Sequence, residues 1–455
     1  MNEFVGRGGS GVEKFTGCHP GARQEMRHPS CSRSGVVACL QFIHSFRPRL
    51  LPIHRTWHTT VVNERTEMHL SAARQAFLTA GITVLVFAAV LYFTTGSVHP
   101  TFGNSVADLP SQLSNTEFWS MVTDFSEPDG YFRSDNFLSN EAGFQEVIPA
   151  LKRTIMPGGV YLGVGPEQNF TYIAALKPRI AFIIDIRRQN MIEHLLYKAF
   201  IELAADRADF VSKLFARPRP AGLGSGSTAE TLFNAYGAAN PNGNLFEKNL
   251  SMAIDRLAAK GIPLSVDDQA SMRKVYNAFF ESGPDLSYTF IGNERSASRG
   301  MPSYTDLMTA TDDDGKNWGY LATENQFEIV QQLERNNLIV PVVGNFAGDK
   351  TIRTIGKYVA DHHASVTTFY LSNVEQYLFQ QNDDWSRFYA NVGTLPIDST
   401  STFIRSTADR RALFRGRGRW PLRMLTASIA EHVQAFNAGQ IHAYYDVVGR
   451  TNTVN

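Results

Sequence analysis

The sequence predicts an α/β fold built on a doubly wound, mostly parallel sheet, with a mainly helical insertion and an N-terminal transmembrane helix. Within residues 158–190, an apolar strand, a glycine turn, a helix and a second apolar strand follow one another. Helices and strands alternate again between 324 and 371, which is typical of parallel sheets. Residues 76–93 are apolar and uncharged over a length that spans a bilayer.

Residues 1–74 differ in composition from the rest of the chain. They hold ten Lys and Arg residues against five Asp and Glu, six of the twelve His and all three Cys. No sustained apolar period runs through them, so we predict a basic, disordered leader. Met68 is an alternative start, because a short polar segment and the apolar run follow it in the layout of a signal anchor. The residues before Met68 would then not be native.

Charge balance and cysteine content exclude several classes of protein. The 455 residues carry 43 basic and 43 acidic side chains, which argues against binding nucleic acid through overall charge. Apolar residues make up 43% of the chain, so it can bury a sizeable core and is not a disordered polyelectrolyte. Three cysteines are too few for a disulfide-built scaffold.

Residues 75–96 are predicted to form one transmembrane helix, followed by a loose tether over 97–116. The uncharged stretch reaches the roughly 20 residues that a bilayer-spanning helix needs. A buried core helix is the alternative, although such helices usually carry a polar stripe. Basic residues precede the apolar run, whereas the first Lys or Arg after it is Arg133. The positive-inside rule therefore places the N-terminus in the cytoplasm and the globular domain outside it.

The globular domain is predicted over 117–447, and its most informative segment is 158–190. The second strand of this segment has the continuous apolar character of a strand that is buried on both faces, and it ends at Asp185. The elements in order are a strand at Val160–Leu162, a turn at Gly163–Pro166, a helix at Glu167–Leu176 and a strand at Ile180–Ile184.

Further elements continue this alternation. Residues 190–214 have the apolar spacing of one long, core-facing helix. Residues 216–320 begin with a run of Pro and Gly and are predicted as an insertion over the carboxyl edge of the sheet, with helices near 245–260 and 267–281. The elements after the insertion are a helix at 324–336, a strand at 338–343, a helix at 349–362 and a strand at 366–371.

The glycine turn and Asp185 together suggest a ligand site. A Gly-x-Gly turn lets the backbone approach a ligand, and the helix that follows presents its first N–H groups. An acid at the end of the next strand accepts hydrogen bonds from ribose hydroxyls. The alternative is a turn whose glycines are purely structural, in which Asp185 pairs with Arg187 or Arg188.

The residues over roughly 155–375 resemble the core of class I S-adenosylmethionine-dependent methyltransferases, a Rossmann-like fold. The matching turn is Gly163-Val164-Gly165-Pro166, and Asp185 matches the ribose-binding acid. The run FSEPDGYFRSDNFLSNE (125–141), taken with 158–190, is similar to an uncharacterised bacterial family with that core.

This resemblance implies S-adenosylmethionine as the cofactor. The backbone of the glycine turn would pass close to the donor, and Asp185 would hold the ribose. The implied cofactor-binding residues are Tyr161, Gly163, Gly165, Glu167, Asp185 and Asn345; no catalytic residue follows from the resemblance.

The sequence departs from the methyltransferase pattern at two turn positions. Tyr161 stands where an acid is usual, and Glu167 replaces the third turn glycine. A carboxylate at a helix start disfavours a phosphate there, which weighs against a nicotinamide dinucleotide. No Asn/Asp-Pro-Pro-aromatic motif occurs, since the strand at 338–343 ends in Gly344-Asn345, and the methyl acceptor is therefore not readable.

Two functions follow from these observations. The first is a membrane-anchored methyltransferase-like protein that binds S-adenosylmethionine or a similar nucleoside. The second is a non-enzymatic ligand-binding or envelope-interaction domain. The charges place the domain outside the cytoplasm, whereas S-adenosylmethionine is a cytoplasmic metabolite. Because the resemblance is to a bacterial family, we expect the protein in the bacterial inner membrane. Residues 76–93 would lie in the lipid bilayer, and the globular domain would lie in the periplasm.

Two polar groups are further candidate sites. Ser139-Asn140-Glu141 either folds back over the ligand crevice or caps a helix over 141–153. His362-His363 has no third ligand within the motif. We therefore predict no metal, and the balanced overall charge predicts no nucleic acid among the partners.

Overall fold

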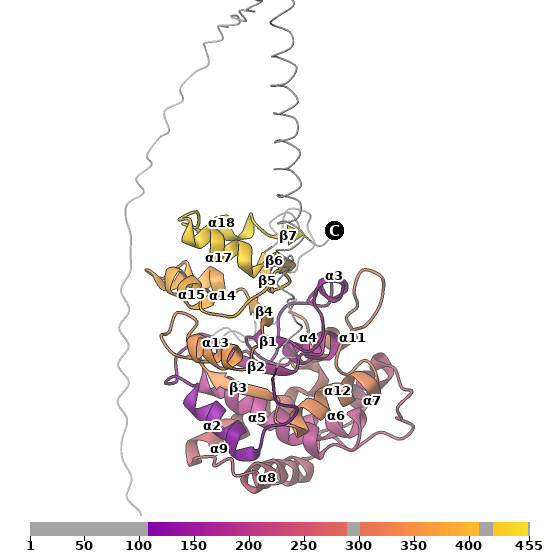
Figure 1. The fold of residues 1–455 in the computed structure, drawn as a ribbon. Coiled ribbons are helices and arrows are strands. Elements are labelled where there is room, and N and C mark those ends of the chain that lie inside the picture. The colour runs from indigo at the N-terminus through magenta and orange to yellow at the C-terminus, as the bar shows by residue number, and fades with distance from the viewer. Residues whose placement is uncertain (1–107, 289–300, 409–421, 454–455) are drawn as a thin grey trace, which may run out of the picture. The chain divides into compact units, whose positions relative to one another are not determined.

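The computed structural model describes residues 108–288, 301–408 and 422–453 (Figure 1). The predicted leader, the transmembrane helix at 75–96 and the first part of the tether lie outside these ranges. Within them, no helix combines the length and the apolar character that crossing a membrane requires.

A seven-stranded sheet lies at the centre of the described residues (Figure 1). Its spatial order is β3-β2-β1-β4-β5-β6-β7. The strands from β3 to β5 in this order pair in parallel, and β6 and β7 pair antiparallel. The strands are β1 (Val160–Gly163), β2 (Ile180–Asp185), β3 (Ile339–Val343), β4 (Val366–Ser372), β5 (Thr402–Ala408), β6 (Leu422–Ser428) and β7 (Asn452–Thr453).

The order of the strands reverses beside β1. The chain passes from β1 to β2 and β3 in one direction, and then returns to the other side of β1 for β4 and β5. Because connections between parallel strands are right-handed, α4 (Gln168–Leu176) and α13 (Thr351–Asp361) cover opposite faces of the sheet. Every residue of β2 is buried. The mostly parallel α/β sheet predicted from the sequence is therefore confirmed.

Two groups of helices cover the sheet. In the first group, α4 and α5 both pack against α12, and α5 also contacts β2 and β3; in the second, α15 packs against α13, α14 and α17. The remaining members of these groups are α5 (Arg188–Leu203), α12 (Glu324–Arg335), α14 (Val374–Leu378), α15 (Asp384–Val392) and α17 (Ile429–Asn437). Three further helices complete the body: α2 (Asn115–Asp124), α3 (Ile148–Thr154) and α18 (Tyr444–Val448).

A helical insertion separates α5 from α12. Phe246 stacks on Tyr276 with the ring centroids 4.6 Å apart, which joins the two long helices that were predicted near 245–260 and 267–281. The elements of the insertion are α6 (Arg207–Phe215), α7 (Ala229–Ala238), α8 (Gly243–Ala259), α9 (Val266–Ser282), η1 (Gly283–Asp285) and α11 (Tyr304–Thr309).

The single helix predicted over 190–214 is wrong. The structure breaks it into α5 and α6, because Ala204 is extended and Asp206 caps a new helix by accepting a hydrogen bond from the Asp209 backbone N–H. Asp is a preferred N-cap residue, since its carboxylate satisfies an N–H that has no partner within the helix. The apolar spacing continues across the break and therefore hid it.

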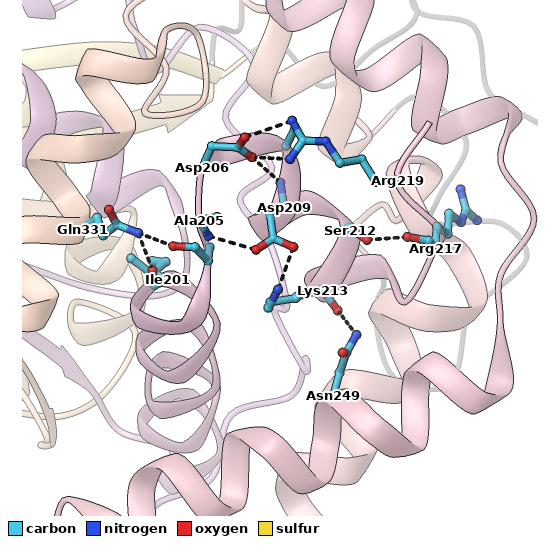
Figure 2. A network of polar contacts seen from close by, with 12 residues as sticks. Ile201, Ala205, Asp206, Asp209, Ser212, Lys213, Arg217, Arg219, Asn249 and Gln331 are labelled. Carbon is cyan, nitrogen blue, oxygen red and sulfur yellow. Dashed lines mark hydrogen bonds and ion pairs between the residues drawn. The ribbon is translucent and has the colours of Figure 1, made fainter. Parts of the chain in front are cut away.

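Polar contacts fix this break in place (Figure 2). The Asp209 carboxylate accepts hydrogen bonds from the Ala205 backbone N–H at 2.9 Å and from Lys213 Nζ at 2.6 Å. Arg219 forms an ion pair with Asp206 at 2.9 Å. From α12, the amide of Gln331 donates to the backbone carbonyl of Ile201 at 2.8 Å, so the end of α5 is tied to the helix that follows the insertion.

Candidate functional site

A cavity of about 810 Å³ opens at the carboxyl edge of the sheet. Residues at or just beyond the ends of all five parallel strands line it. These strands include β1 and β4, the neighbouring pair at which the strand order reverses. The strand-end residues are Val164 and Gly165 after β1, Asp185, Ile186 and Arg187 around the end of β2, Gly344 and Asn345 after β3, Ser372 and Asn373 at β4, and Ala408 at β5.

The six cofactor-binding residues predicted from the sequence divide into two groups. Gly165, Asp185 and Asn345 line the cavity. Tyr161, Gly163 and Glu167 are not among the lining residues, and the side chains of Tyr161 and Glu167 are fully buried behind the wall. Three of the six predicted residues therefore lie at the cavity, and the other three do not line it.

The glycine turn is held from behind by Asn169 on α4. Its amide nitrogen donates to the carbonyl of Val164 at 3.0 Å and to the carbonyl of Pro166 at 2.7 Å. Its Oδ1 accepts from Tyr161 Oη at 2.8 Å. Gly165 has a φ of +78°, a value that only glycine adopts without cost. The turn is therefore a rigid loop whose backbone faces the cavity.

Asp185 forms a buried ion pair with Arg187. Nε and Nη2 of Arg187 lie 2.9 Å from the two carboxylate oxygens, and the Arg187 backbone N–H donates to Oδ1 at 2.9 Å. Nη1 donates to the carbonyl of Ser134 at 2.9 Å. Burial alone would lower the pKa of Arg187, but the charge and hydrogen bonds of Asp185, together with the nearby Glu193 and Tyr288, outweigh it and the pKa is raised. The sequence left open whether Asp185 pairs with Arg187 or with Arg188. In the structure it pairs with Arg187, and Arg188 pairs with Asp268 at 2.7 Å.

Asn345 lies in a turn that Glu127 stabilises. The carboxylate of Glu127 accepts hydrogen bonds from three backbone N–H groups, those of Asn345 at 2.7 Å, Lys350 at 2.9 Å and Thr351 at 3.3 Å. The side chain of Asn345 accepts from the Ala347 N–H at 3.0 Å. The turn after β3 is therefore fixed by a residue more than 200 positions earlier in the chain.

Glu167 occupies a different position from the one expected. Its carboxyl group is buried beside the backbone N–H of Ser139, with Oε1 3.4 Å from that nitrogen. Burial is the main cause that raises its pKa to about 8, and the charge of Glu141 adds to the shift. At neutral pH the group is therefore mostly uncharged, and it does not line the cavity. Glu167 therefore gives no electrostatic reason to exclude a phosphate at this helix start.

Replacing Glu167 with glutamine is expected to make stability depend less on pH. Between about pH 4.5 and about pH 8, the folded state keeps a proton that the unfolded state releases. The free energy of unfolding of the wild type therefore falls as pH rises through this range, and the loss is complete above it. Glutamine has no such proton. In thermal unfolding, the melting temperature of the variant minus that of the wild type should increase up to about pH 8 and then level off.

The control for this experiment is the exposed Glu230 in α7. A Glu230→Gln variant changes an exposed side chain and should differ little from the wild type in melting temperature. Parallel profiles for Glu167→Gln and the wild type would contradict the raised pKa.

The segment Ser139-Asn140-Glu141 contributes to the cavity instead of capping a helix. Ser139 and Asn140 line the cavity, and the Ser139 hydroxyl accepts a hydrogen bond from the Glu141 N–H at 3.1 Å. The helix that this segment was expected to cap begins only at Ile148. The capping alternative is therefore wrong, and the segment forms part of the cavity wall.

Ser372 and Asn373 line the cavity but are not among the residues predicted from the sequence. The strand ending in Gly344-Asn345, where the methyltransferase acceptor motif was expected, is β3 at the sheet edge. β1 pairs with β2 on one side and with β4 on the other, and β4 ends at Ser372, with Asn373 directly after it. No local signal in these residues distinguishes them; only the order of the strands could have done so.

No metal centre is evident in the part of the chain that the structure describes. No group of three or more His, Cys, Asp or Glu side chains is arranged there to hold an ion. His362 ends α13, with its Nδ1 2.8 Å from the Tyr358 carbonyl oxygen, so this histidine has a structural contact.

The fold is that of a doubly wound α/β protein with a cavity at the carboxyl edge of its sheet. The chain belongs to the family described as "Domain of unknown function (DUF7790)", whose model matches residues 136–221 and 227–437. No curated protein matches the sequence.

Proposed function

We propose that the protein binds S-adenosylmethionine or a similar nucleoside in the carboxyl-edge cavity, as a membrane-anchored, methyltransferase-like protein. The observation that carries this proposal is the position of the cavity over β1 and β4, where the strand order reverses. Open α/β sheets bind their ligands at this point. The volume of about 810 Å³ also lies within the range of roughly 300–1,000 Å³ that is common for small-molecule sites.

The lining supplies contacts that suit a nucleoside. The backbone of Gly165 faces the cavity, and Asp185 stands at the end of β2. A carboxylate offers about four lone-pair positions, so Asp185 can accept ribose hydroxyls while it keeps its pairing with Arg187. Methyl transfer by direct displacement mainly requires that donor and acceptor are positioned, and amide side chains serve that purpose. The lining amides are Asn136, Asn140, Gln168, Asn345, Asn373, Gln376 and Gln381.

Calorimetric titration of the purified full-length protein with S-adenosylmethionine tests the proposal. We expect saturable binding to the wild type. Asp185→Asn should weaken it at least about tenfold, or about 1.4 kcal/mol, because the amide keeps only one acceptor oxygen and loses the charge. The matched control is Asp268→Asn, which breaks the ion pair of Arg188 away from the cavity lining and should leave the affinity unchanged. A folded protein that gives no saturable heat with millimolar donor would remove S-adenosylmethionine as the ligand.

A non-enzymatic ligand-binding or envelope-interaction domain is the second candidate. The observation that favours it is the complete ion pair of Asp185, whose two oxygens already accept hydrogen bonds from Arg187. Such a carboxylate is satisfied without a ligand. This candidate predicts that the Asp185→Asn change alters stability but not the affinity for any nucleoside.

The membrane anchor remains part of the proposal. Residues 76–93 would cross the bacterial inner membrane once, with the N-terminus in the cytoplasm and the globular domain in the periplasm. Fusions at the C-terminus test this orientation. We expect an alkaline phosphatase fusion to be active and a green fluorescent fusion to be dark. The opposite result would place the domain in the cytoplasm, where S-adenosylmethionine is available, and would favour the methyltransferase candidate.

A further inference from the structure

Ser372 has an unusual backbone conformation at the end of β4. Six non-glycine residues of the described ranges have a positive φ. Four of them directly follow a helix, where this conformation is common; they are Lys177, Ala216, Asn337 and His363. The other two, Asn136 and Ser372, both line the cavity. Ser372 has a φ of +50°, which costs on the order of 1 kcal/mol or more.

The strand pairing changes at the same place. The register between β4 and β5 shifts between Tyr370 and Ser372, and α14 begins two residues later, at Val374. Irregularities of this kind often lie next to active sites, because they re-aim a side chain. A serine on a strained turn between a strand and a helix is also the geometry that exposes the nucleophile in many α/β hydrolases.

A buried carboxylate lies against the serine hydroxyl. Ser372 Oγ donates to Oε1 of Glu141 at 2.5 Å. Glu141 is only 1% exposed, and no Lys, Arg or His is among its hydrogen-bond or ion-pair partners in the described ranges. Burial raises the pKa of Glu141, whereas the hydrogen bond from Ser372 opposes the shift. Glu141 is therefore a stronger base than an exposed carboxylate.

Two further side chains hold the carboxylate in its orientation. Tyr370 Oη donates to Oε2 of Glu141 at 2.7 Å. The same hydroxyl accepts from Gln168 Nε2 at 2.9 Å, and Gln168 is 3% exposed. Hydroxyl, base and a third group that orients the base form the arrangement that activates a nucleophile.

We propose that Ser372 is a nucleophile, with Glu141 as its general base, for acyl transfer from activated carboxylic esters that enter the cavity. This inference goes beyond nucleoside binding and does not depend on it. Ser372 ends β4, whereas Gly165 and Asp185, the residues proposed to contact the nucleoside, lie after β1 and at the end of β2.

The chemistry balances without a cofactor. Ser372 Oγ attacks the carbonyl carbon of the ester, and its proton passes to Oε1 of Glu141. The ester C–O bond breaks, and the leaving alkoxide takes the proton from Glu141. Water then attacks the acyl-serine and gives a proton to Glu141, which returns it to Ser372 as the carboxylic acid leaves. Asn373 and Gln376 line the same wall, and their amide N–H groups can stabilise the oxyanion.

Labelling with an alkyl fluorophosphonate tests the pair directly. The reagent forms a P–O bond to an activated serine and releases fluoride. Full-length protein is incubated with the reagent, and the modified peptide is identified by mass spectrometry. We expect one label per chain, on Ser372. Ser372→Ala should abolish it, and Glu141→Gln should slow it about 100-fold or more, which is the usual effect of losing a general base.

Controls separate reactivity from folding. Ser120→Ala removes an exposed hydroxyl on α2 and should label like the wild type. Thermal unfolding shows which variants fold; if Glu141→Gln does not, Glu141→Asp replaces it, because the shorter side chain withdraws the carboxylate from Ser372. Folded wild type that is not labelled on Ser372, or a labelling rate that neither change at Glu141 reduces, would overturn the proposal.

Discussion

Replacing Arg405 with methionine is expected to lower the free energy of unfolding by about 3–5 kcal/mol, because it leaves a buried carboxylate without its cation. Arg405 on β5 forms a two-point ion pair with Glu375 on α14, and both side chains are only 3% exposed. Nη1 of Arg405 lies 3.1 Å from His432 Nε2, and Tyr389 also donates to Glu375. The guanidinium thus joins β5 to α14 and α17, and Glu375 extends the network to Tyr389 on α15.

Urea unfolding followed by tryptophan fluorescence measures this effect. The matched control is Arg387→Met, since Arg387 pairs with Asp349 at the surface, where the side chains are 44% and 84% exposed. Exposed ion pairs contribute about 0–1 kcal/mol. Equal losses of stability in the two variants would show that burial of the Arg405 pair has no energetic consequence.

Changing Gly163 to alanine should have the second-largest effect. A Cβ at this position would lie 1.9 Å from Asn169 Oδ1 and 2.7 Å from a ring carbon of Tyr161. Both groups are buried and hydrogen-bonded to each other, so neither can withdraw. Overpacking of this kind costs about 1–3 kcal/mol, and displacement of Asn169 would also release the carbonyls of the glycine turn. We expect lower stability together with loss of ligand binding.

Gly237→Ala is the control for that change. Gly237 lies in α7, no atom lies within 4 Å of a Cβ built there, and its φ is not positive. Alanine in a helix is favoured over glycine by about 0.5–1 kcal/mol, so this variant should be slightly more stable and bind like the wild type. A Gly163→Ala variant with wild-type stability and affinity would refute the close packing behind the turn.

The predicted elements that proved correct are those with a continuous local signal. β2 reads as an unbroken apolar run because both of its faces are buried. α4, α12 and α13 follow turn or cap signals that sit next to their apolar faces. For these elements, the forces that select the conformation act between residues close in the sequence.

The strands β5 and β6 were not predicted, and the reason is tertiary. β5 carries Arg405 at a buried position. A charged residue within a strand does not predict that the strand is buried. Its charge is satisfied by Glu375, 30 residues away. Since the compensating partner lies on another element, no window of sequence around β5 contains the information.

The candidate site was predictable only in part for the same reason. The turn containing Gly165 and the strand ending at Asp185 are local patterns, and both reach the cavity. Which way Glu167 points depends on Ser139, and the importance of Ser372 depends on β4 lying beside β1 and on its contact with Glu141. These contacts join segments up to about 230 residues apart. Neither residue spacing nor composition could have predicted them.

The contacts of Glu127 have a consequence for where the folding unit begins. The family model starts at residue 136, yet the carboxylate of Glu127 caps the turn after β3, and its own backbone N–H donates to the carbonyl of Val343 at 2.8 Å. A recombinant fragment cut at the family boundary would lose these hydrogen bonds, and Asn345 would no longer be held at the cavity. A fragment that keeps the site intact therefore has to include Glu127, and one that begins at about residue 108 also keeps α2, which packs against β3.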